Sequence, residues 1–485
     1  MKRRYKQFKD IFVSDKFLIP VILLLAFFVR MYKIATPLAD WHSWRQSDTA
    51  AVSRIYVDEG INLLFPKYYD ISRIQTGIFN PEGLRMVEFP FYNVIHAVLA
   101  SNFSIFSLEI WGRLISIVFA ILSTYLLYLL GNRFLGKWGG TLSAFFYAFM
   151  PYNIYFTRVI LPEPMALFFA LFGSWLFVKH LDQESNKFLY LSGIMFAISM
   201  LIKPFTFFYL VPLVFLVIQK HKKDLFEAKV LIPLLVFANI ALAPFFLWRI
   251  WINEFPRGIP YFNWAFNGDD IRFRPAFWRW IFGERLGKLF LGYWGLVLFS
   301  FGILRKSKGS FYIRSLLLGL FFYVAIFATA SVRHDYYQIF VIPGIALTLA
   351  SGTKELLSFK YNKFFASGLV LFSVAMMFLV GAQEAREYYK INHMEIVLAG
   401  KAADELLPKD ARVIAPYNGD TAFLYQTKRY GWPVVDESID RMIERGADYY
   451  VTVNKDNDLA NIKQRFMAVE ETNAYAIVDL HKKIN

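Results

Sequence analysis

Residues 17–34 read FLIPVILLLAFFVRMYKI. This apolar run is close to the ~20 residues with which an α-helix crosses the hydrocarbon core of a bilayer. A run near an N-terminus can also be a signal peptide, but no small-residue cleavage site follows this one and many similar runs do. We therefore interpret it as a retained membrane span.

Apolar runs of the same length recur through most of the 485 residues, of which 56% are hydrophobic. A soluble protein would disperse these residues in amphipathic patterns, whereas here they form uninterrupted blocks. The blocks predict a polytopic α-helical membrane protein with about eleven spans, near residues 17–34, 109–131, 139–157, 161–180, 187–202, 204–219, 229–251, 286–304, 311–331, 335–352 and 364–382.

The polar intervals between the runs alternate in character, and every second one is short and basic. These basic intervals are Met1–Lys9 (MKRRYKQFK), Arg133 with Lys137, Lys179–Lys187, Lys220–Lys223 (KHKK), Arg305–Arg314 (RKSKGSFYIR) and Lys354–Lys363. By the positive-inside rule they face the cytoplasm, so we expect a multi-pass plasma-membrane protein with a cytoplasmic N-terminus and an extracytoplasmic C-terminus. This bias also accounts for the net charge of +15 without a nucleic-acid partner.

The long intervals fall on the opposite, outer side. Residues 35–108 form a first outer loop, with helices expected over 48–60 and 89–103, the second lying along the membrane. Residues 252–285 form a second outer segment that is rich in Trp, Phe and Arg, as in an interfacial lid. We divide the chain into a transmembrane domain, residues 1–383, and an extracytoplasmic α/β domain, residues 384–485.

The α/β prediction rests on short β-like runs that alternate with helical patterns after residue 384. The expected strands are 412–416, 448–453, 466–470 and 476–480, and the expected helices are 394–407, 420–426 and 438–445. The chain contains no cysteine. Disulfides, thiolate metal sites and cysteine nucleophiles are therefore excluded.

Charged residues at the mouths of membrane helices are costly, so each needs a partner or a function. On the predicted topology they gather on the outer face: Asp40, His42, Arg45, Asp48 and Glu88 in the first loop, Arg158 and Glu163 around one turn, Lys203 at the next junction, and Arg333, His334 and Asp335 at another. Interfacial anchors and helix caps would explain any one of them. The whole set favours a functional site.

Such a set suits glycosyl transfer from a lipid-linked phosphosugar. A carboxylate can remove the proton of an acceptor hydroxyl as it attacks the anomeric carbon. Lysine or arginine can stabilise the negative charge of the departing lipid phosphate. The sequence has no Walker loop and no glycine-rich nucleotide cradle, so soluble nucleotide chemistry is not indicated.

Four segments in this order resemble the GT-C class of membrane glycosyltransferases, in particular the branch of the protein O-mannosyltransferases and the lipid A aminoarabinose transferase. They are LADWHSWRQSDTAAVSRIYVDEG (Leu38–Gly60), Glu88-Phe89-Pro90-Phe91-Tyr92, Arg158 with Glu163-Pro164 and then Lys203-Pro204, and Arg333-His334-Asp335-Tyr336-Tyr337 with Ile342-Pro343. The resemblance spans about residues 17–349. It implies an inverting transferase that moves a sugar from a polyprenyl phosphate to an acceptor on a protein, lipid or glycan.

Carried over to this chain, the resemblance implies that Lys203 and Arg333, with Arg158 and Tyr336, hold the donor phosphate. Glu88 would position donor or acceptor, and the remaining substrate contacts would be His42, Arg45, Gln46, Glu163, His334, Asp335 and Tyr337. The family's Asp-Glu pair falls on Arg45-Gln46 here, so the base must be Asp40 or Asp48. We favour Asp40, which lies nearer the mouth of the first span. Asp48 can instead be read as an acidic residue in the first turn of a helix.

We predict no cofactor. A divalent ion held by His42, His334 and Asp335 is the less favoured alternative. Two other functions compete with an enzyme: a lipid-linked sugar transporter or flippase, and a non-catalytic membrane scaffold. Transporters usually show repeated halves and helices broken at the midplane. Here no repeat is visible and the charges lie at one face.

Overall fold

The computed structural model describes residues 15–359 and 362–484. The chain packs into two compact units. The helical unit comprises the described residues up to 34 together with 113–248 and 263–387, and the sheet unit comprises 35–112, 249–262 and 388–484. Each unit is described by itself.

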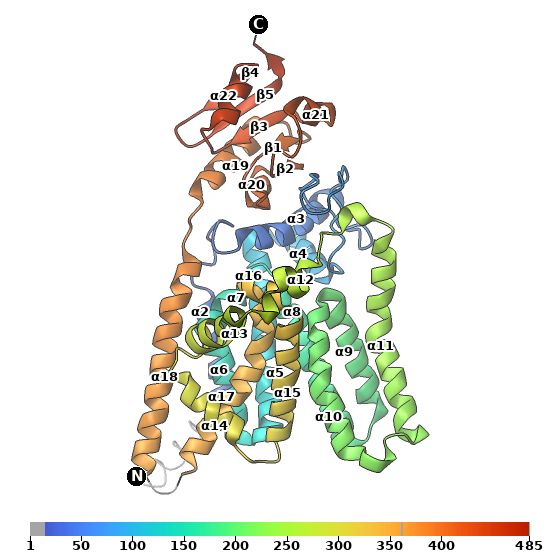
Figure 1. Ribbon diagram of the computed structural model, residues 1–485, viewed down its shortest axis with the longest axis vertical. Helices are drawn as coiled ribbons and strands as arrows, with labels where there is room; N and C mark the ends of the chain where they lie inside the picture. Colours follow the sequence, from blue (N-terminus) through green and yellow to red (C-terminus); the bar gives the residue numbers. More distant parts are fainter. Residues whose placement is uncertain (1–14, 360–361, 485) are drawn as a thin grey trace. The chain divides into compact units, whose positions relative to one another are not determined.

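The helical unit is an α-helical bundle, with α11 and α18 at its two edges in the view of Figure 1. Its elements are α2 (Asp15–Arg30), α5 (Leu108–Leu135), α6 (Lys137–Phe149), α7 (Pro151–Phe156), α8 (Glu163–Gln183), α9 (Asn186–Ile202), η1 (Pro204–Tyr209), α10 (Leu210–His221), η2 (Lys222–Asp224), α11 (Ala228–Asn253), α12 (Trp264–Asn267), η4 (Gly268–Phe273), α13 (Pro275–Arg279), the π-helical η5 (Trp280–Phe290), α14 (Gly295–Leu304), α15 (Ser310–Ile326), α16 (Ala328–Arg333), η6 (Asp335–Val341), α17 (Ile342–Leu357), α18 (Lys363–Ala385) and η7 (Arg386–Tyr389). The first residues of α5 and the last of α11 pack with the sheet unit.

Each of the predicted apolar runs is helical in the structure. Within the described residues, six helices are long and apolar enough to cross a membrane, and a helix pair bent by 114°, Pro275–Phe290 with Gly295–Leu304, makes a seventh candidate. Phe17–Arg30, Asn186–Ile202 and Ser310–Ile326 are shorter apolar helices. The protein is therefore a multi-pass membrane protein, and the count of eleven spans stays a prediction.

Several of the predicted spans are broken rather than continuous, for local chemical reasons. The run 139–157 divides into α6 and α7 because Met150 is extended (φ −60°, ψ 120°) and Pro151 begins the next helix. Proline has no N–H to donate and disfavours a helical residue before it. Between the two helices of the bent pair lie Gly292 and Tyr293, both with positive φ. Such breaks give short helices that an apolar run does not reveal.

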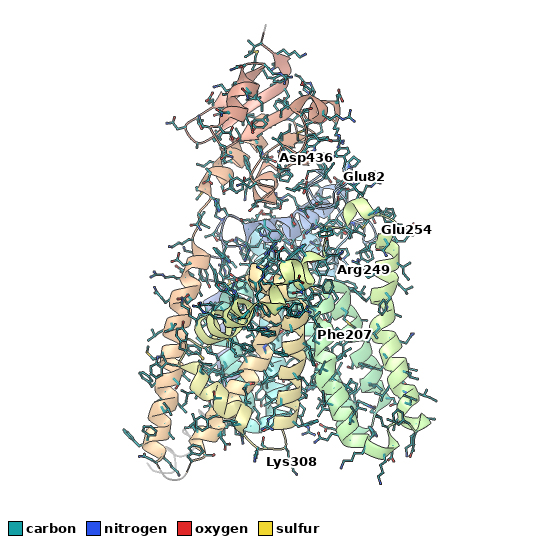
Figure 2. The ribbon with its side chains drawn as sticks, viewed as in Figure 1. Glu82, Phe207, Arg249, Glu254, Lys308 and Asp436 are labelled. Carbon is teal, nitrogen blue, oxygen red and sulfur yellow. The ribbon has the colours of Figure 1, made fainter. Side chains whose placement is uncertain are left out.

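In the helical unit, a helix that has a predicted site residue at or before its start has a basic interval at its opposite end. Helix α8 begins at Glu163 and ends in the basic interval that starts at Lys179, and α10 follows Lys203 and ends at Lys220–Lys223. Figure 1 shows the α10–α11 and α14–α15 connections at the same end of the bundle, and Figure 2 labels Lys308 in the second of these. The predicted basic segment Met1–Lys9 lies outside the described residues.

The sheet unit combines three segments of the chain, of which the first two were predicted to belong to the transmembrane domain and the third to the α/β domain. Its elements are α3 (Ser43–Glu59), α4 (Phe91–Asn102), η3 (Pro256–Gly258), α19 (Met394–Leu406), β1 (Val413–Ile414), α20 (Thr421–Thr427), β2 (Gly431–Trp432), α21 (Ile439–Glu444), β3 (Tyr449–Thr452), α22 (Asn457–Lys463), β4 (Phe466–Glu471) and β5 (Ala476–Lys483). The strands form one five-stranded sheet in the order β2-β1-β3-β5-β4. Strand β1 is parallel to β2 and β3, and β5 is antiparallel to β3 and β4.

The first loop adds its own backbone to the free edge of this sheet. The amide of Ile71 donates to the carbonyl of Gly431 at 2.9 Å, and the amide of Gly431 donates to the carbonyl of Tyr69 at 2.9 Å. Ile71 enters the apolar core beneath the sheet, and the ring of Phe79 stacks on Trp432 with 6.3 Å between centroids. By packing, the loop therefore belongs with the C-terminal segment. The prediction that the chain divides after residue 383 into two separately acting domains stays a prediction.

The predicted α/β pattern after residue 384 is confirmed, with two omissions. Strand β2 was not predicted, because it has only two residues and one of them is Gly431. A glycine is needed there, since an added Cβ would lie 1.8 Å from the carbonyl oxygen of Val413. Helix α22 escaped because its start is set by a cap, with Asp456 accepting from the amide of Leu459 at 3.1 Å. The expected helix at 48–60 begins five residues earlier, at Ser43.

Candidate functional site

Asp40 lies in the sheet unit just before helix α3 and is buried, with 5% of its surface exposed. His42 adopts a left-handed backbone conformation (φ 53°) that turns the chain into the helix. From the first turn of α3, Gln46 donates a hydrogen bond from Nε2 to Oδ1 of Asp40 at 2.7 Å and another to the carbonyl of Trp41 at 3.3 Å. The segment Asp40–His42 is thus folded back against its own helix, and the orientation of the Asp40 carboxylate is defined.

Two ion pairs clamp α3 to the later part of the first loop. Arg45 pairs with Glu88, and Asp48 pairs with Arg85 at 2.8 Å. Arg45 and Asp48 are three residues apart on α3 and so lie on one face of it. Arg85 and Glu88 have the same spacing and the same order of charge, so the crosswise pairing aligns the two segments in opposite directions. The two ion pairs therefore fix a single alignment of the loop along the helix.

Asp48 has its remaining oxygen occupied as well. The hydroxyl of Thr421 donates to Oδ1 of Asp48 at 2.6 Å. Both members of the Asp48–Arg85 pair are buried, and Arg85 also donates to Oε1 of Gln75 at 2.6 Å. The neighbouring carboxyl of Asp70 is fully buried, and burial raises its pKa to about 6. These contacts make Asp48 part of a buried structural network.

We expect the Asp48→Asn substitution to destabilise the folded protein by ~3–5 kcal/mol, because it leaves the buried guanidinium of Arg85 without a counter-ion. The double variant Asp48→Asn, Arg85→Gln removes both charges and keeps an oxygen for Thr421, so it should recover most of that loss. Thermal unfolding of the purified variants in detergent measures both effects. Equal melting temperatures for wild type and single variant would contradict the structural role of Asp48.

In the helical unit, Lys203 and Glu163 form an ion pair at 3.0 Å. Lys203 is 5% exposed and Glu163 is fully buried. Helix α9 ends at Ile202 because Pro204 disfavours a helical Lys203, which is extended (φ −147°, ψ 111°). The hydroxyl of Thr206 donates to the carbonyl of Lys203 at 2.9 Å and fixes this break. The fold therefore pairs Lys203 with Glu163, two residues that were both predicted to belong to the site.

Arg158 lies in the turn between α7 and α8 and is fully buried. Its Nη2 donates to the carbonyl of Lys33 at 2.6 Å, and its guanidinium lies 5.9 Å from the ring centroid of Tyr155. Arg158 therefore joins the α7–α8 turn to the residues that follow α2. It lies in the helical unit, as do Glu163 and Lys203.

The segment Arg333–Tyr337 divides into exposed and buried parts. The side chain of Arg333 is 55% exposed and pairs with Asp269 at 3.2 Å. Asp335 is buried, pairs with Arg285, and accepts a hydrogen bond on its carbonyl oxygen from the hydroxyl of Tyr152 at 2.5 Å. Arg333 is thus the accessible cation of this segment, whereas Asp335 is buried in its ion pair with Arg285.

The aromatic residues of the same segment are packed. The ring of His334 lies 5.3 Å from that of Trp264 and 5.5 Å from that of Tyr336, measured between centroids. Tyr336 is buried, and Tyr337 packs at 5.1 Å on Phe205. Phe207, in the same 3₁₀ turn as Phe205, is 46% exposed and is labelled in Figure 2. Tyr337 therefore contributes to an aromatic core.

The predicted residues thus fall into two groups, one in each unit. Asp40, His42, Arg45, Gln46, Asp48 and Glu88 belong to the sheet unit, and Arg158, Glu163, Lys203, Arg333, His334, Asp335, Tyr336 and Tyr337 belong to the helical unit. Within the described part of the chain, no three His, Asp or Glu residues gather closely enough to hold a metal ion.

Four residues that were not predicted from the sequence each pair with a predicted one: Arg85, Asp269, Arg285 and Thr421. Arg85 carried a usable signal, since it precedes Glu88 by three residues as Arg45 precedes Asp48. The other three lie far from their partners along the chain, and no spacing rule connects them.

The chain resembles known proteins both in sequence, over part of its length, and in fold. Residues 94–248 match the family model of the dolichyl-phosphate-mannose-protein mannosyltransferases. A search of curated protein sequences found no significant match. Among solved structures, ArnT of Cupriavidus metallidurans bound to undecaprenyl phosphate has a TM-score of 0.66 and 11% identity over 96% of this chain and 98% of that chain. Its apo state has a TM-score of 0.66 and 13% identity over 95% and 97%.

An archaeal protein shares the fold as well. The oligosaccharyltransferase of Archaeoglobus fulgidus in complex with Zn and sulfate has a TM-score of 0.60 and 10% identity over 89% of this chain and 67% of that chain. The predicted resemblance is confirmed: the chain has the fold of the GT-C membrane glycosyltransferases, and its residues 94–248 match the protein mannosyltransferase family.

Proposed function

We propose that the protein is an inverting glycosyltransferase that moves a monosaccharide from a polyprenyl-phosphate donor to a hydroxyl group of an extracytoplasmic acceptor. Two kinds of observation support this reaction. The fold is that of membrane transferases, one of which was solved with undecaprenyl phosphate. The chain also supplies a buried, oriented carboxylate, Asp40, and several cations near helix ends of the helical unit.

In the proposed reaction, Asp40 is the general base. Its carboxylate takes the proton of the acceptor hydroxyl as the acceptor oxygen bonds to the anomeric carbon, and the bond from that carbon to the phosphate oxygen breaks. The polyprenyl phosphate leaves with the electron pair of this bond. The observation that supports Asp40 over Asp48 is the structural role of Asp48, which pairs with the buried Arg85 and ties α3 to Thr421 of the C-terminal segment.

Lys203 and Arg333 are proposed to hold the donor phosphate, with Arg158 and Tyr336 beside them. Positive charge of fixed orientation stabilises the leaving phosphate more as its charge develops. We propose that Arg45 and Glu88 hold the first loop against α3, since they form an ion pair with each other. Because lysine and arginine meet the phosphate charge, we further propose that transfer needs no metal or organic cofactor. The cytoplasmic N-terminus and the extracytoplasmic sheet unit belong to the same proposal.

The test uses the full-length protein in liposomes with a panel of polyprenyl-phosphate monosaccharides and a cell-envelope fraction as acceptor source. A transferase releases free polyprenyl phosphate and a glycosylated product with inverted anomeric configuration, measured by mass spectrometry and NMR. A flippase would move the donor between leaflets without releasing polyprenyl phosphate, and a scaffold would do neither. Activity should be retained in EDTA, and restoration by added Mg²⁺ or Mn²⁺ after loss in EDTA would contradict the cofactor-free reaction.

A further inference from the structure

Helix α20, in the C-terminal segment, contacts both the backbone just before Asp40 and helix α3. The side chain of Gln426 donates from Nε2 to the carbonyl of Leu38 at 3.0 Å. The hydroxyl of Thr421 donates to Asp48 at 2.6 Å and lies 3.4 Å from the carbonyl of Trp44. One short helix thus contacts the chain two residues before Asp40 and again on the helix that follows it.

The rest of the local structure transmits these contacts to the Asp40 carboxylate. Leu38 and Ala39 are buried, so the backbone that Gln426 contacts has little freedom to move. On the other side, α3 carries Gln46, which donates directly to Asp40 at 2.7 Å. Gln46 therefore contacts the carboxylate directly, and α20 contacts both the backbone that leads into Asp40 and the helix that carries Gln46.

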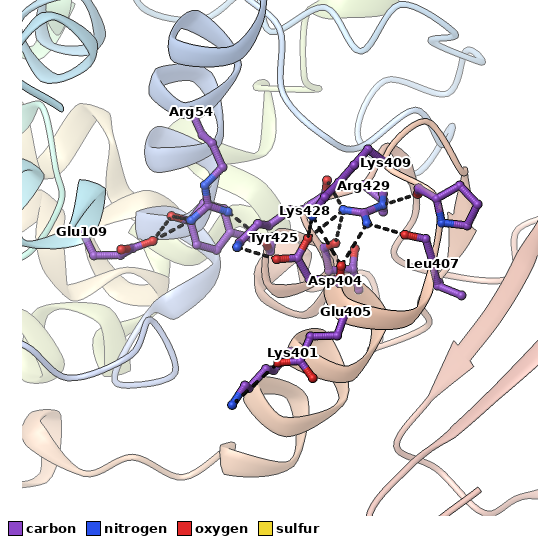
Figure 3. A network of polar contacts seen from close by, with 12 residues as sticks. Arg54, Glu109, Lys401, Asp404, Glu405, Leu407, Lys409, Tyr425, Lys428 and Arg429 are labelled. Carbon is purple, nitrogen blue, oxygen red and sulfur yellow. Dashed lines mark hydrogen bonds and ion pairs between the residues drawn. The ribbon is translucent and has the colours of Figure 1, made fainter. Parts of the chain in front are cut away.

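Helix α20 is itself fixed firmly to the α/β fold. An added Cβ at Gly400 of α19 would lie 2.3 Å from Cβ of Gln426, so the two helices pack with no space between them. Just after α20, the fully buried Arg429 donates to the carbonyls of Leu407 and Pro408 at 2.8 and 2.7 Å and to Asp404 at 3.1 Å. Figure 3 shows this network.

A third polar contact of α20 reaches the far end of α3. The guanidinium of Arg54 lies 3.9 Å from the ring centroid of Tyr425 and donates to the Tyr425 carbonyl at 3.1 Å, while the Tyr425 hydroxyl donates to Glu109 at 2.7 Å. Figure 3 shows Arg54, Tyr425 and Glu109 as one cluster. The helix is therefore attached to α3 at both ends, at Asp48 and at Arg54.

We propose that α20 positions the catalytic base, with Gln426 and Thr421 as positioning residues that act through Leu38 and α3 on Asp40. This inference rests on the proposed function, because it needs Asp40 to be the base. It gives the C-terminal α/β segment a part in the transfer step. Displacing a catalytic group by ~1 Å from a distance can lower a rate ~10²-fold.

The test compares two substitutions that remove a donor with one that does not touch the site. Gln426→Met and Thr421→Val keep side-chain volume and remove the hydrogen bonds to Leu38 and Asp48. Thr427→Val is the matched control, because Thr427 is buried on the same helix but its hydroxyl donates within that helix, to Leu424 at 2.7 Å. Thr421→Ser keeps the hydroxyl and serves as the conservative variant.

We expect Gln426→Met and Thr421→Val to lower kcat by ~10–100-fold, in line with displaced catalytic groups, while donor KM stays within about twofold of wild type. Thr421→Ser and Thr427→Val should keep wild-type kcat. Rates are measured at a temperature well below the lowest melting temperature of the set, so that unfolding does not contribute. A purely structural role would change the amount of folded enzyme and leave the kcat of the folded fraction unchanged.

The two hypotheses fail differently. If the wild-type protein releases no polyprenyl phosphate with any donor, the proposed function is wrong. If the wild type is active and Gln426→Met and Thr421→Val match Thr427→Val in kcat, the positioning role is wrong while the proposed function stands. A rise in donor KM with unchanged kcat would also overturn the positioning role, because it would assign α20 to donor binding.

Discussion

Replacing Asp40 with Asn is expected to lower kcat for glycosyl transfer by ~10²–10⁴-fold, the usual contribution of a positioned general base. Asparagine has nearly the same shape and still accepts the hydrogen bond of Gln46, so the local fold should persist. It carries no negative charge and does not take a proton at neutral pH, and a general base needs both properties. Initial rates of polyprenyl-phosphate release at saturating donor and acceptor measure the effect.

The control for this experiment is the double variant Asp48→Asn, Arg85→Gln. It removes the other candidate carboxylate together with its buried partner, so no uncompensated charge remains. We expect this variant to retain transfer at a rate near that of wild type per folded molecule. The reverse result, with Asp40→Asn active and the double variant inactive, would assign the base to Asp48.

Donor binding separates loss of chemistry from loss of the site. Asp40→Asn should bind the polyprenyl-phosphate sugar as tightly as wild type, because our proposal assigns the phosphate to cations of the helical unit. Thermal unfolding should also be unchanged. A variant that loses activity, donor binding and stability together would show that Asp40 supports the fold rather than the reaction.

The sequence was most informative where a pattern is local. Apolar runs and basic loops predicted the helical bundle, and alternating short runs predicted the α/β fold after residue 384. The position of the first loop was not predictable in this way, because its pairing with the sheet depends on Ile71 meeting Gly431, which lies 360 positions later.

The candidate base illustrates the same limit. From sequence, Asp40 and Asp48 were near equals, distinguished only by distance from the first span. The structure adds what Asp48 does: it pairs with the buried Arg85 and accepts a hydrogen bond from Thr421 within a buried network. The resemblance places Gln46 at a position where the family has a carboxylate, and the structure shows that its amide instead orients the nearby Asp40.

Lys203 carries the second large prediction, and its burial decides the design. Lys203→Met alone removes the cation that pairs with the buried Glu163, so we expect a loss of ~3–5 kcal/mol in folding free energy. The double variant Lys203→Met, Glu163→Gln removes both charges and should restore the melting temperature to near that of wild type. Only this second variant can report on phosphate binding without confusion from unfolding.

We expect the double variant to bind donor at least ~10-fold more weakly than wild type, because a hydrogen bond to a charged group contributes ~1.5–3 kcal/mol. The matched control is Arg133→Gln, Asp182→Asn, which removes an exposed ion pair of 2.5 Å between α5 and α8. This control should change neither stability nor affinity by much, as is usual for exposed pairs. Binding is measured by isothermal titration of undecaprenyl phosphate into protein in nanodiscs. Equal affinity in the two double variants would remove Lys203 from the phosphate site and leave the exposed Arg333 as the cation to test next.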